Sequence, residues 1–178
     1  MDYQMDHAVA ILRRTPATLK TLLAGLPDVW VRSDAGPGTW SAYAVVGHLL
    51  HGEETDWLAR ARIILEHGES RPFDPFNRTA MFDKYTDYSL ERLLDAFEQA
   101  RVRNLEALDA LKITSEKLAL KGTHPALGTV TLGQLLSTWV VHDLNHIGQI
   151  LETLSHQYAQ AVGPWRAYLG ILRPIVTE

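Results

Sequence analysis

The chain has 178 residues, eight histidines, no cysteine, and 17 basic against 21 acidic side chains, for a formal net charge of −4 at pH 7. This length suits one domain with a substantial core, so we expect residues 1–178 to form a single domain. Without cysteine, disulfides, thiolate nucleophiles and iron–sulfur clusters are excluded, and any metal must be held by imidazole, carboxylate or water. The slightly acidic balance argues against nucleic acid as a partner, because binding phosphates takes clustered Lys and Arg.

The first residues, MDYQMDHAVAILRR, place acids ahead of the apolar run and have neither a basic start nor a small-residue cleavage site. They therefore do not resemble a signal peptide. No stretch approaches the roughly 18 to 20 unbroken apolar residues of a membrane span. We expect a cytoplasmic protein with no membrane partner.

Proline and glycine fall in clusters, and the long intervals between the clusters are rich in Ala, Leu, Glu and Arg. These residues favour helix, so the fold class predicted is all-α. Four helical intervals are predicted, over residues 2–24, 40–66, 89–111 and 131–158. Loops are predicted over residues 27–39, 71–79 and 121–130, with a short helical turn near 81–88.

Local signals mark the ends of these helices. Thr15-Pro16 predicts a kink or a break in the first interval. Ser89 is expected to cap the third helix, and Thr131 with Gln134 has the form of a capping box at the start of the fourth.

Beyond Gly163-Pro164 we expect a short extra C-terminal helix over 165–172. Four long helices with wide apolar faces pack most economically as an up-down four-helix bundle. Loops near Trp30, Phe73 and Phe76 are expected to roof a pocket at one end of it.

The fourth predicted helix contains His142 and His146, which are neighbours on one helical face. At 100° per residue they lie about 40° apart, beside the apolar stripe of Leu135 and Trp139, so both should face inward. Two imidazoles at this spacing can share a metal ion. Chance pairs at this spacing are common, so two hydrogen-bonded core histidines remain an alternative.

A third inward histidine strengthens the metal hypothesis. His48 shares its face of the second helix with Val45 and Leu49, whereas His51 lies toward the other side, so we prefer His48 as the ligand. Three imidazoles from two helices are typical of a metal site inside a bundle. The other histidines lie near helix ends or in loops and are expected to be ordinary: His7, His67, His124 and His156.

Two segments carry a resemblance to a known family. They are WSAYAVVGHL, from Trp40 to Leu49, and HDLNHIGQ, from His142 to Gln149. In this order and at this separation they resemble the DinB/YfiT-like metal-dependent enzymes, over most of the chain. The resemblance implies a helical bundle that binds a divalent metal, nickel or zinc, through His48, His142 and His146, and that forms homodimers.

Three neutral imidazoles leave coordination positions open, which is the arrangement of a catalytic metal rather than a structural one. Such an ion would activate water or a thiol. Some members of the resembled family transfer low-molecular-weight thiols, which implies an S-transferase; a hydrolase acting on a small molecule is equally compatible. Because the chain has no cysteine, any sulfur would arrive with a substrate.

Two rival functions stay open. The first is a non-catalytic, stress-related binding or scaffold protein, whose histidines hydrogen-bond in the core or bind metal incidentally. The second is a small-molecule sensor that binds without turnover. Replacement of His48 distinguishes the first from an enzyme, because an enzyme would lose metal and activity but keep its fold, and turnover distinguishes the second.

Other polar residues could serve the site. Gln149 lies one turn beyond His146 and could hydrogen-bond bound water or an imidazole, or be an ordinary half-exposed glutamine. Asp56 and Glu53 are candidate general bases. Asp143 lies at the centre of an apolar face, so it needs an arginine, a tryptophan N–H or a histidine as partner, and we favour a structural role for it.

Overall fold

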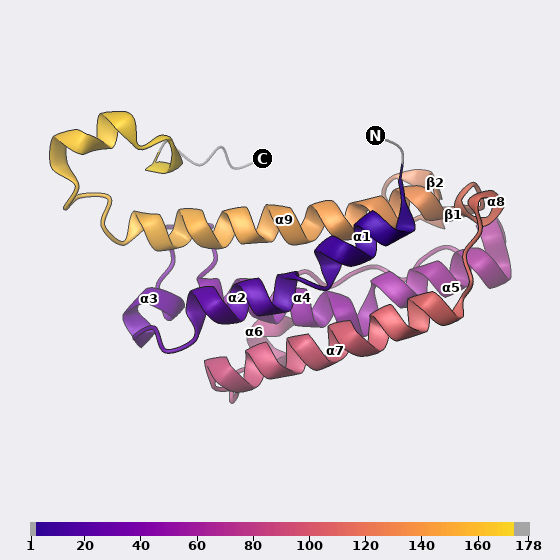
Figure 1. Cartoon of the computed structure of the whole chain (residues 1–178), viewed down its shortest axis with the longest axis horizontal. Helices are drawn as coiled ribbons and strands as arrows, with labels where there is room; N and C mark the ends of the chain where they lie inside the picture. The colour runs from indigo at the N-terminus through magenta and orange to yellow at the C-terminus, as the bar shows by residue number, and fades with distance from the viewer. Residues whose placement is uncertain (1–2, 173–178) are drawn as a thin grey trace.

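The structure, a computed structural model, describes residues 3–172 and consists of four long helical rods (Figure 1). The rods comprise α1 (Met5–Leu12) with α2 (Thr15–Leu23), α4 (Ala42–Thr55) with α5 (Trp57–His67), α7 (Leu90–Ala110), and α9 (Leu132–His156). The predicted four-helix bundle is confirmed. No helix within the described residues is long and apolar enough to cross a membrane.

Short elements lie in the connections. They are α3 (Asp28–Arg32), the 3-10 turn η1 (Gly68–Ser70), α6 (Met81–Lys84), α8 (Ser115–Leu118), and, near the C-terminus, the 3-10 turns η2 (Gly163–Tyr168) and η3 (Gly170–Leu172). The predicted C-terminal helix is thus two 3-10 turns. The sequence prediction missed α3 and α8, because helices of four or five residues are too short to show periodicity.

The prediction of a loop over residues 121–130 was wrong. This segment forms an antiparallel hairpin of β1 (Lys121–His124) and β2 (Gly128–Thr131), with Lys121 opposite Thr131. Threonine and valine favour strands, but four-residue strands carry too little alternation to be recognised. Gly128 supplies the positive φ of 73° that the turn requires.

The predicted helix starts are confirmed where side chains cap them. The Ser89 hydroxyl accepts from the Arg92 N–H at 3.2 Å. Thr131 and Gln134 form a complete capping box at the start of α9. Ser41 caps α4 by accepting from the Ala44 N–H, also at 3.2 Å, which fixes where the helix carrying His48 begins.

Two of the rods are divided. The first breaks between α1 and α2, as predicted, with Pro16 in the first turn of α2 and no side-chain cap from Thr15. The second was expected to be one continuous helix, but it breaks at Asp56, where φ is −112° and ψ is −74°. No proline or glycine marks this position, so the sequence held no signal for the break.

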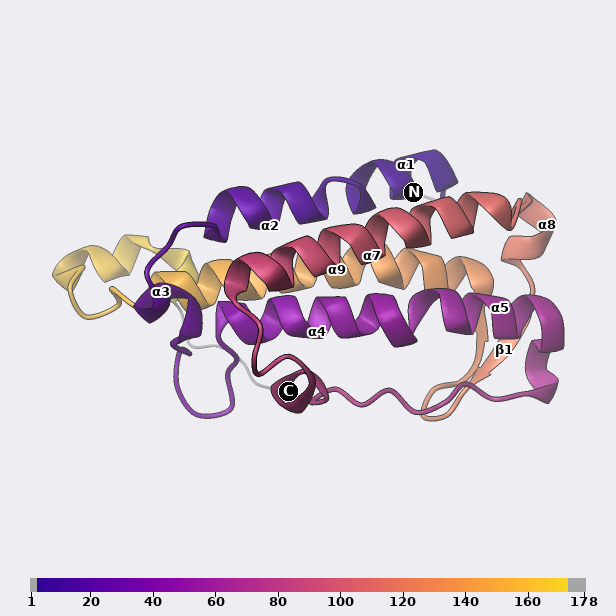
Figure 2. The ribbon, with the colours of Figure 1, turned by 90° about the horizontal axis from the view of Figure 1, so that it is seen from below.

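Successive rods do not all run in opposite directions, as they would in a simple up-down bundle. Tyr43, near the start of α4, donates to the carbonyl of Tyr88 just before α7, and Glu53, near the end of α4, meets Arg101 farther along α7. The helices α4 and α7 are therefore parallel. The chain between α5 and α7 returns along the length of the bundle (Figure 2), and this return makes the parallel pair possible.

The interior has two apolar clusters with a polar layer between them. One cluster holds Leu49 of α4, Phe97 of α7 and Ile150 of α9; the other holds Trp57 of α5, Leu108 of α7 and Trp139 of α9. Buried polar side chains from α4, α7 and α9 fill the level between the clusters: His48, Glu53, Arg101, Asp143 and His146. Because burial of polar groups is costly unless they are paired, this layer is where a site is expected.

Candidate metal centre

Three imidazoles converge in the polar layer. The Nε2 atom of His142 lies 3.1 Å from the Nε2 atom of His48 and 3.1 Å from that of His146. Four positions separate the two histidines of α9, whereas 94 positions separate His48 from His142. The packing of α4 against α9 therefore creates the cluster, which we call the histidine triad.

The spacing of the triad suits a shared ion. Imidazole nitrogens that bind one ion at about 2.0–2.1 Å lie roughly 2.8–3.4 Å apart when they subtend about 90–109° at the metal. Each residue offers one ligand atom, and all three atoms lie within 4.8 Å of one another. Three ring nitrogens facing one point cannot all be satisfied by hydrogen bonds among themselves, because each is either a single donor or a single acceptor. The donor set therefore fits a divalent cation.

The opposite ring nitrogens orient two of the three imidazoles. Nδ1 of His146 lies 2.7 Å from Oε1 of Gln149, and Nδ1 of His48 lies 3.4 Å from the backbone oxygen of Arg78. Such contacts fix the tautomer that leaves Nε2 free for a metal. Nδ1 of His142 is buried and has no partner among the residues described.

Burial keeps the triad neutral. It lowers the pKa of His48 to about 4 and that of His142 to about 2, and it also lowers the pKa of His146. The neighbouring imidazoles push the pKa values of His48 and His142 in the same direction, since a second positive charge would be repelled. Neutral imidazole is the form that binds metal, so the environment favours the ligand state of these rings.

Aromatic rings surround the triad. The Trp40 ring lies 5.0 Å from that of His48 and 6.4 Å, nearly parallel, from that of His146. Phe76 also meets the His48 ring edge-on, at 5.4 Å, and Trp57 meets the His142 ring at 5.0 Å. These rings restrict access of water to the nitrogens and strengthen electrostatic interactions there.

Of the loop aromatics expected to roof a pocket, Phe76 alone contacts the triad within the described residues. Phe73 is buried in the apolar cluster near the hairpin and meets His124 at 6.1 Å. Trp30 packs edge-on against Tyr158 at 4.9 Å. The expectation of a common roof is therefore wrong for Trp30 and Phe73, because α3, which carries Trp30, and the loop that carries Phe73 pack on other parts of the bundle.

A buried ionic network lies next to the triad and accounts for Asp143. Arg101 of α7 contacts the Asp143 carboxylate at 2.6 and 2.9 Å and Glu53 at 2.8 Å. Trp139 and Asn104 also donate to Glu53, at 2.8 and 2.9 Å. Of the three kinds of partner expected for Asp143, the structure supplies an arginine.

The same network removes Glu53 from the candidate bases. Its side chain is fully buried, and both carboxylate oxygens accept hydrogen bonds. Burial raises the pKa of Glu53, while Arg101 opposes that change. With its oxygens occupied, Glu53 is a structural acid.

The remaining candidates lie at different places. Gln149 contacts the triad through His146. Asp56 lies at the break between α4 and α5, where its Oδ1 atom is 2.5 Å from Nε of Arg60. His51 lies outside the triad and packs its ring on Phe76 at 5.1 Å.

The comparisons with known proteins agree with this architecture. The family model described as the DinB superfamily matches residues 11–150. Among solved structures, the chain is similar to YfiT from Bacillus subtilis, a probable metal-dependent hydrolase with an unusual four-helix bundle topology. That likeness has a TM-score of 0.73 at 22% identity and covers 89% of this chain and 94% of that chain. A comparison with curated protein sequences gave no match.

Proposed function

This chain belongs to the DinB superfamily, and on that premise we propose that it is a metal-dependent enzyme in which His48, His142 and His146 bind nickel or zinc. The observation that carries the proposal is the convergence of three buried Nε2 atoms, with separations of 3.1 Å from His142 to the other two. Imidazole suits both metals. The neutral state of the three rings supports binding near neutral pH.

A divalent ion of this kind supplies Lewis acidity, which lowers the pKa of water or of a thiol toward neutrality. The chain's own groups have separate tasks. Gln149 and the backbone of Arg78 orient two ligand rings, and Trp40 and Phe76 exclude bulk water. Asp56 is the proton acceptor we propose: burial raises its pKa to about 6, near the operating range of a general base. In the structure its carboxylate pairs with Arg60 at the break between α4 and α5, so in this role it would have to leave Arg60 and reach the triad.

Hydrolysis of a small molecule is the reaction we favour, because it needs no co-substrate other than water. Its support is the likeness to YfiT, a probable metal-dependent hydrolase. Transfer of a low-molecular-weight thiol is the second form of the proposal, with the sulfur brought by the co-substrate, since this chain has no cysteine. An assay with and without added thiol separates the two.

Metal content tests the proposal first. Mass spectrometry of protein purified without chelator should give about one nickel or zinc per chain, and His142→Ala should lose it. His156→Ala is the matched control, because His156 lies on the same helix, outside the triad, and its ring hydrogen-bonds to the backbone oxygen of Glu152. A metal-free wild type would overturn the proposal.

Turnover tests the second part of the proposal, which is that the bound metal supports catalysis. The metal-loaded protein should hydrolyse members of a panel of small esters and amides, and His48→Ala should lose both metal and activity while keeping its fold. Asp56→Asn should keep the metal and lose activity. Metal without turnover, with or without thiol, would favour the rival role of a non-catalytic binding or scaffold protein.

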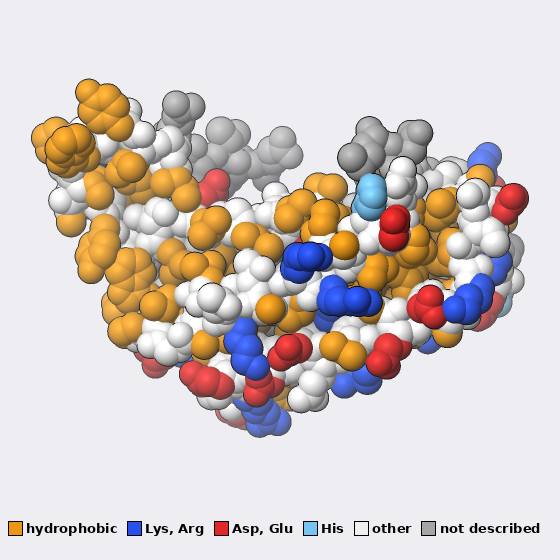
Figure 3. All heavy atoms as spheres, viewed as in Figure 1, with side chains coloured by type: hydrophobic (Ala, Val, Ile, Leu, Met, Phe, Trp, Pro, Cys, Tyr) orange, Lys and Arg blue, Asp and Glu red, His pale blue; other side chains and the backbone are white. Residues whose placement is uncertain are grey.

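We also propose that the chain forms a homodimer. The outward face of α9 exposes Val141, Leu144 and Leu151, and the C-terminal turns expose Trp165 and Tyr168 to 72% and 83%. Apolar side chains gather over this part of the surface (Figure 3). A stripe along a straight helix is self-complementary about a two-fold axis, which supports a second copy as the partner.

A further inference from the structure

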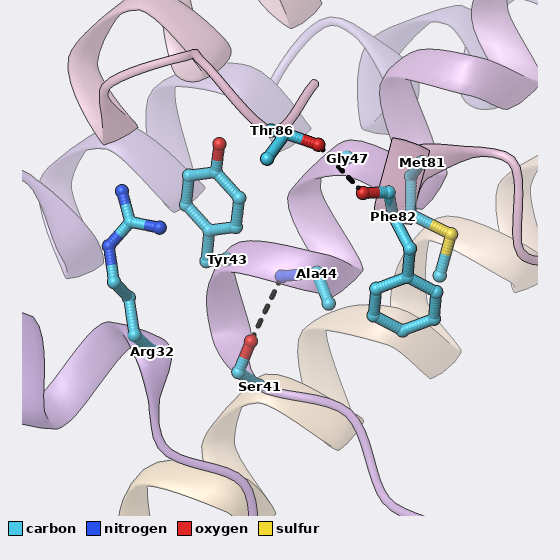
Figure 4. A pocket seen from close by; sticks show the side chains of 8 residues that line it. All are labelled: Arg32, Ser41, Tyr43, Ala44, Gly47, Met81, Phe82 and Thr86. Atoms are coloured by element: carbon cyan, nitrogen blue, oxygen red, sulfur yellow. Dashed lines mark hydrogen bonds between the residues drawn. The ribbon is translucent and has the colours of Figure 1, made fainter. Parts of the chain in front are cut away.

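A small pocket lies on the face of α4 that carries Ala44 and Gly47 (Figure 4). Its volume is about 200 Å³. Ala44 and Gly47 of α4 form its floor, and the other lining residues stand around them: Arg32, Ser41, Tyr43, Met81, Phe82 and Thr86. Since an apolar cavity of about 150 Å³ accommodates benzene, this volume suits one aromatic ring or a short acyl chain.

Most polar atoms of the pocket are already engaged. The Tyr43 hydroxyl contacts the carbonyls of Tyr85 and Tyr88 at 2.7 and 2.8 Å. The Thr86 hydroxyl donates to the carbonyl oxygen of Phe82 at 2.9 Å, so this carbonyl oxygen is occupied as well. A ligand therefore finds few hydrogen-bonding groups here beyond those of Arg32 and Ser41.

Among residues 3–172, Arg32 and Ser41 are the lining residues that still have hydrogens to donate. The Arg32 guanidinium stacks on the Tyr43 ring with Cζ 4.2 Å from the centroid, and its Nε lies 3.5 Å from Asp28. Its terminal nitrogens donate to no other residue in the range 3–172. Ser41 accepts from the Ala44 N–H through its oxygen, so its own hydrogen is free to donate.

The pocket adjoins the triad. Gly47 of the floor directly precedes His48. The Phe82 ring meets the Trp40 ring edge-on at 6.2 Å, and Trp40 in turn contacts His48 at 5.0 Å. One layer of aromatic side chains thus separates the two spaces, and Phe82 is half exposed, at 51%.

We propose that this pocket binds the apolar, carboxylate-bearing part of the substrate, with Arg32 as its counter-ion. The inference rests on the proposed function, because it places the reactive bond of that substrate toward the triad past Trp40 and Phe82. A carboxylate suits the two donors of this pocket, the Ser41 hydroxyl and the Arg32 guanidinium, which is held flat on an aromatic ring. The substrate class is therefore a small aryl or short acyl carboxylate.

Sodium benzoate is the probe, with benzyl alcohol as its uncharged match. Amide NMR titrations of chelator-treated protein should show shifts at Ala44, Gly47 and Phe82. Benzoate should bind about tenfold or more tightly than benzyl alcohol, the effect of a charge-assisted hydrogen bond. Arg32→Gln should abolish the difference, whereas Arg92→Gln should keep it. Arg92 is a matched control because it also stacks on a tyrosine, Tyr88, with Cζ 3.8 Å from the ring, outside the pocket.

Equal affinity for both probes, an unchanged difference in Arg32→Gln, or shifts confined to another surface would overturn the inference. Loading with Co²⁺ then tests the link to the triad: protons of bound benzoate should broaden, and His142→Ala should remove the effect. Uptake of Co²⁺ without broadening would also overturn the inference. Failure to take up any metal would instead count against the proposed function, while the titration would still decide whether the pocket binds a carboxylate.

Discussion

Arg101 and Asp143 are joined by two contacts, of 2.6 and 2.9 Å, in a part of the interior where their side chains are 1% and 0% exposed. The same guanidinium also holds Glu53 at 2.8 Å. One arginine of α7 therefore ties together the two helices that carry the triad, since Glu53 lies on α4 and Asp143 on α9. Because the triad forms between these helices, the ionic network helps to fix its geometry.

Removal of Arg101 should be strongly destabilising. Arg101→Met leaves two buried carboxylates without their cation, which should lower the free energy of unfolding by about 3–5 kcal/mol. Urea denaturation measures this loss. Arg103→Met, on the exposed side of α7, should stay within about 0.5 kcal/mol of wild type. Equal stabilities of the two variants would show that the network contributes nothing.

Gln149 should affect metal affinity rather than folding. Gln149→Ala removes the group 2.7 Å from Nδ1 of His146, so the ring loses its orientation and metal affinity should fall about 10–100-fold. Competition with a chromophoric chelator measures this change. Asn145→Ala, at an exposed position of the same helix, is the control. Unchanged affinity in Gln149→Ala would mean that His146 is held by packing alone.

The sequence was informative wherever a signal is local or periodic. The capping residues Ser89 and Thr131 and the break near Thr15 were predicted because each depends on neighbouring residues. The inward faces of α4 and α9 followed from helical periodicity, and with them the residues of the triad.

Two features could not be predicted from the sequence, the ionic network of Arg101 and the parallel pair of helices, because both depend on contacts between distant segments. Arg101 carries no local signal of burial, since an arginine in a helix usually faces solvent, and its partners Glu53 and Asp143 lie 48 and 42 positions away. The parallel arrangement of α4 and α7 follows from the path of a long connection that carries no periodic signal. Asp143 was the one available clue, because a carboxylate on an apolar face requires a buried partner that donates hydrogen bonds to it.

The proposed dimer can be disrupted from the outer face of α9. Leu144→Lys introduces a charge at a side chain that is 49% exposed, so it should convert a dimer to a monomer without unfolding the chain. Light scattering should give twice the 20.0 kDa of one chain for wild type and the mass of one chain for the variant. Val102→Lys, at a 51% exposed position of α7, should remain dimeric. A monomeric wild type would contradict the proposal.

Because Asp56 is buried, its contribution to the free energy of unfolding should fall as pH rises. Burial raises the pKa of Asp56 from 3.8 to about 6, while Arg60 opposes the change. The folded state therefore holds this proton up to higher pH than the unfolded state, and the contribution of the group to stability is largest below pH 4. It should fall as pH rises toward 6, by up to about 3 kcal/mol.

Asp56→Asn lacks this titration, so the variant should gain stability relative to wild type between pH 4 and pH 7. Urea denaturation at several pH values measures the difference, and Asp74→Asn is the control, because the Asp74 side chain is 87% exposed. A difference between wild type and Asp56→Asn that stays constant over this range would mean that Asp56 ionises normally in the folded protein. Asp56 would then lack the raised pKa on which its proposed role as proton acceptor depends.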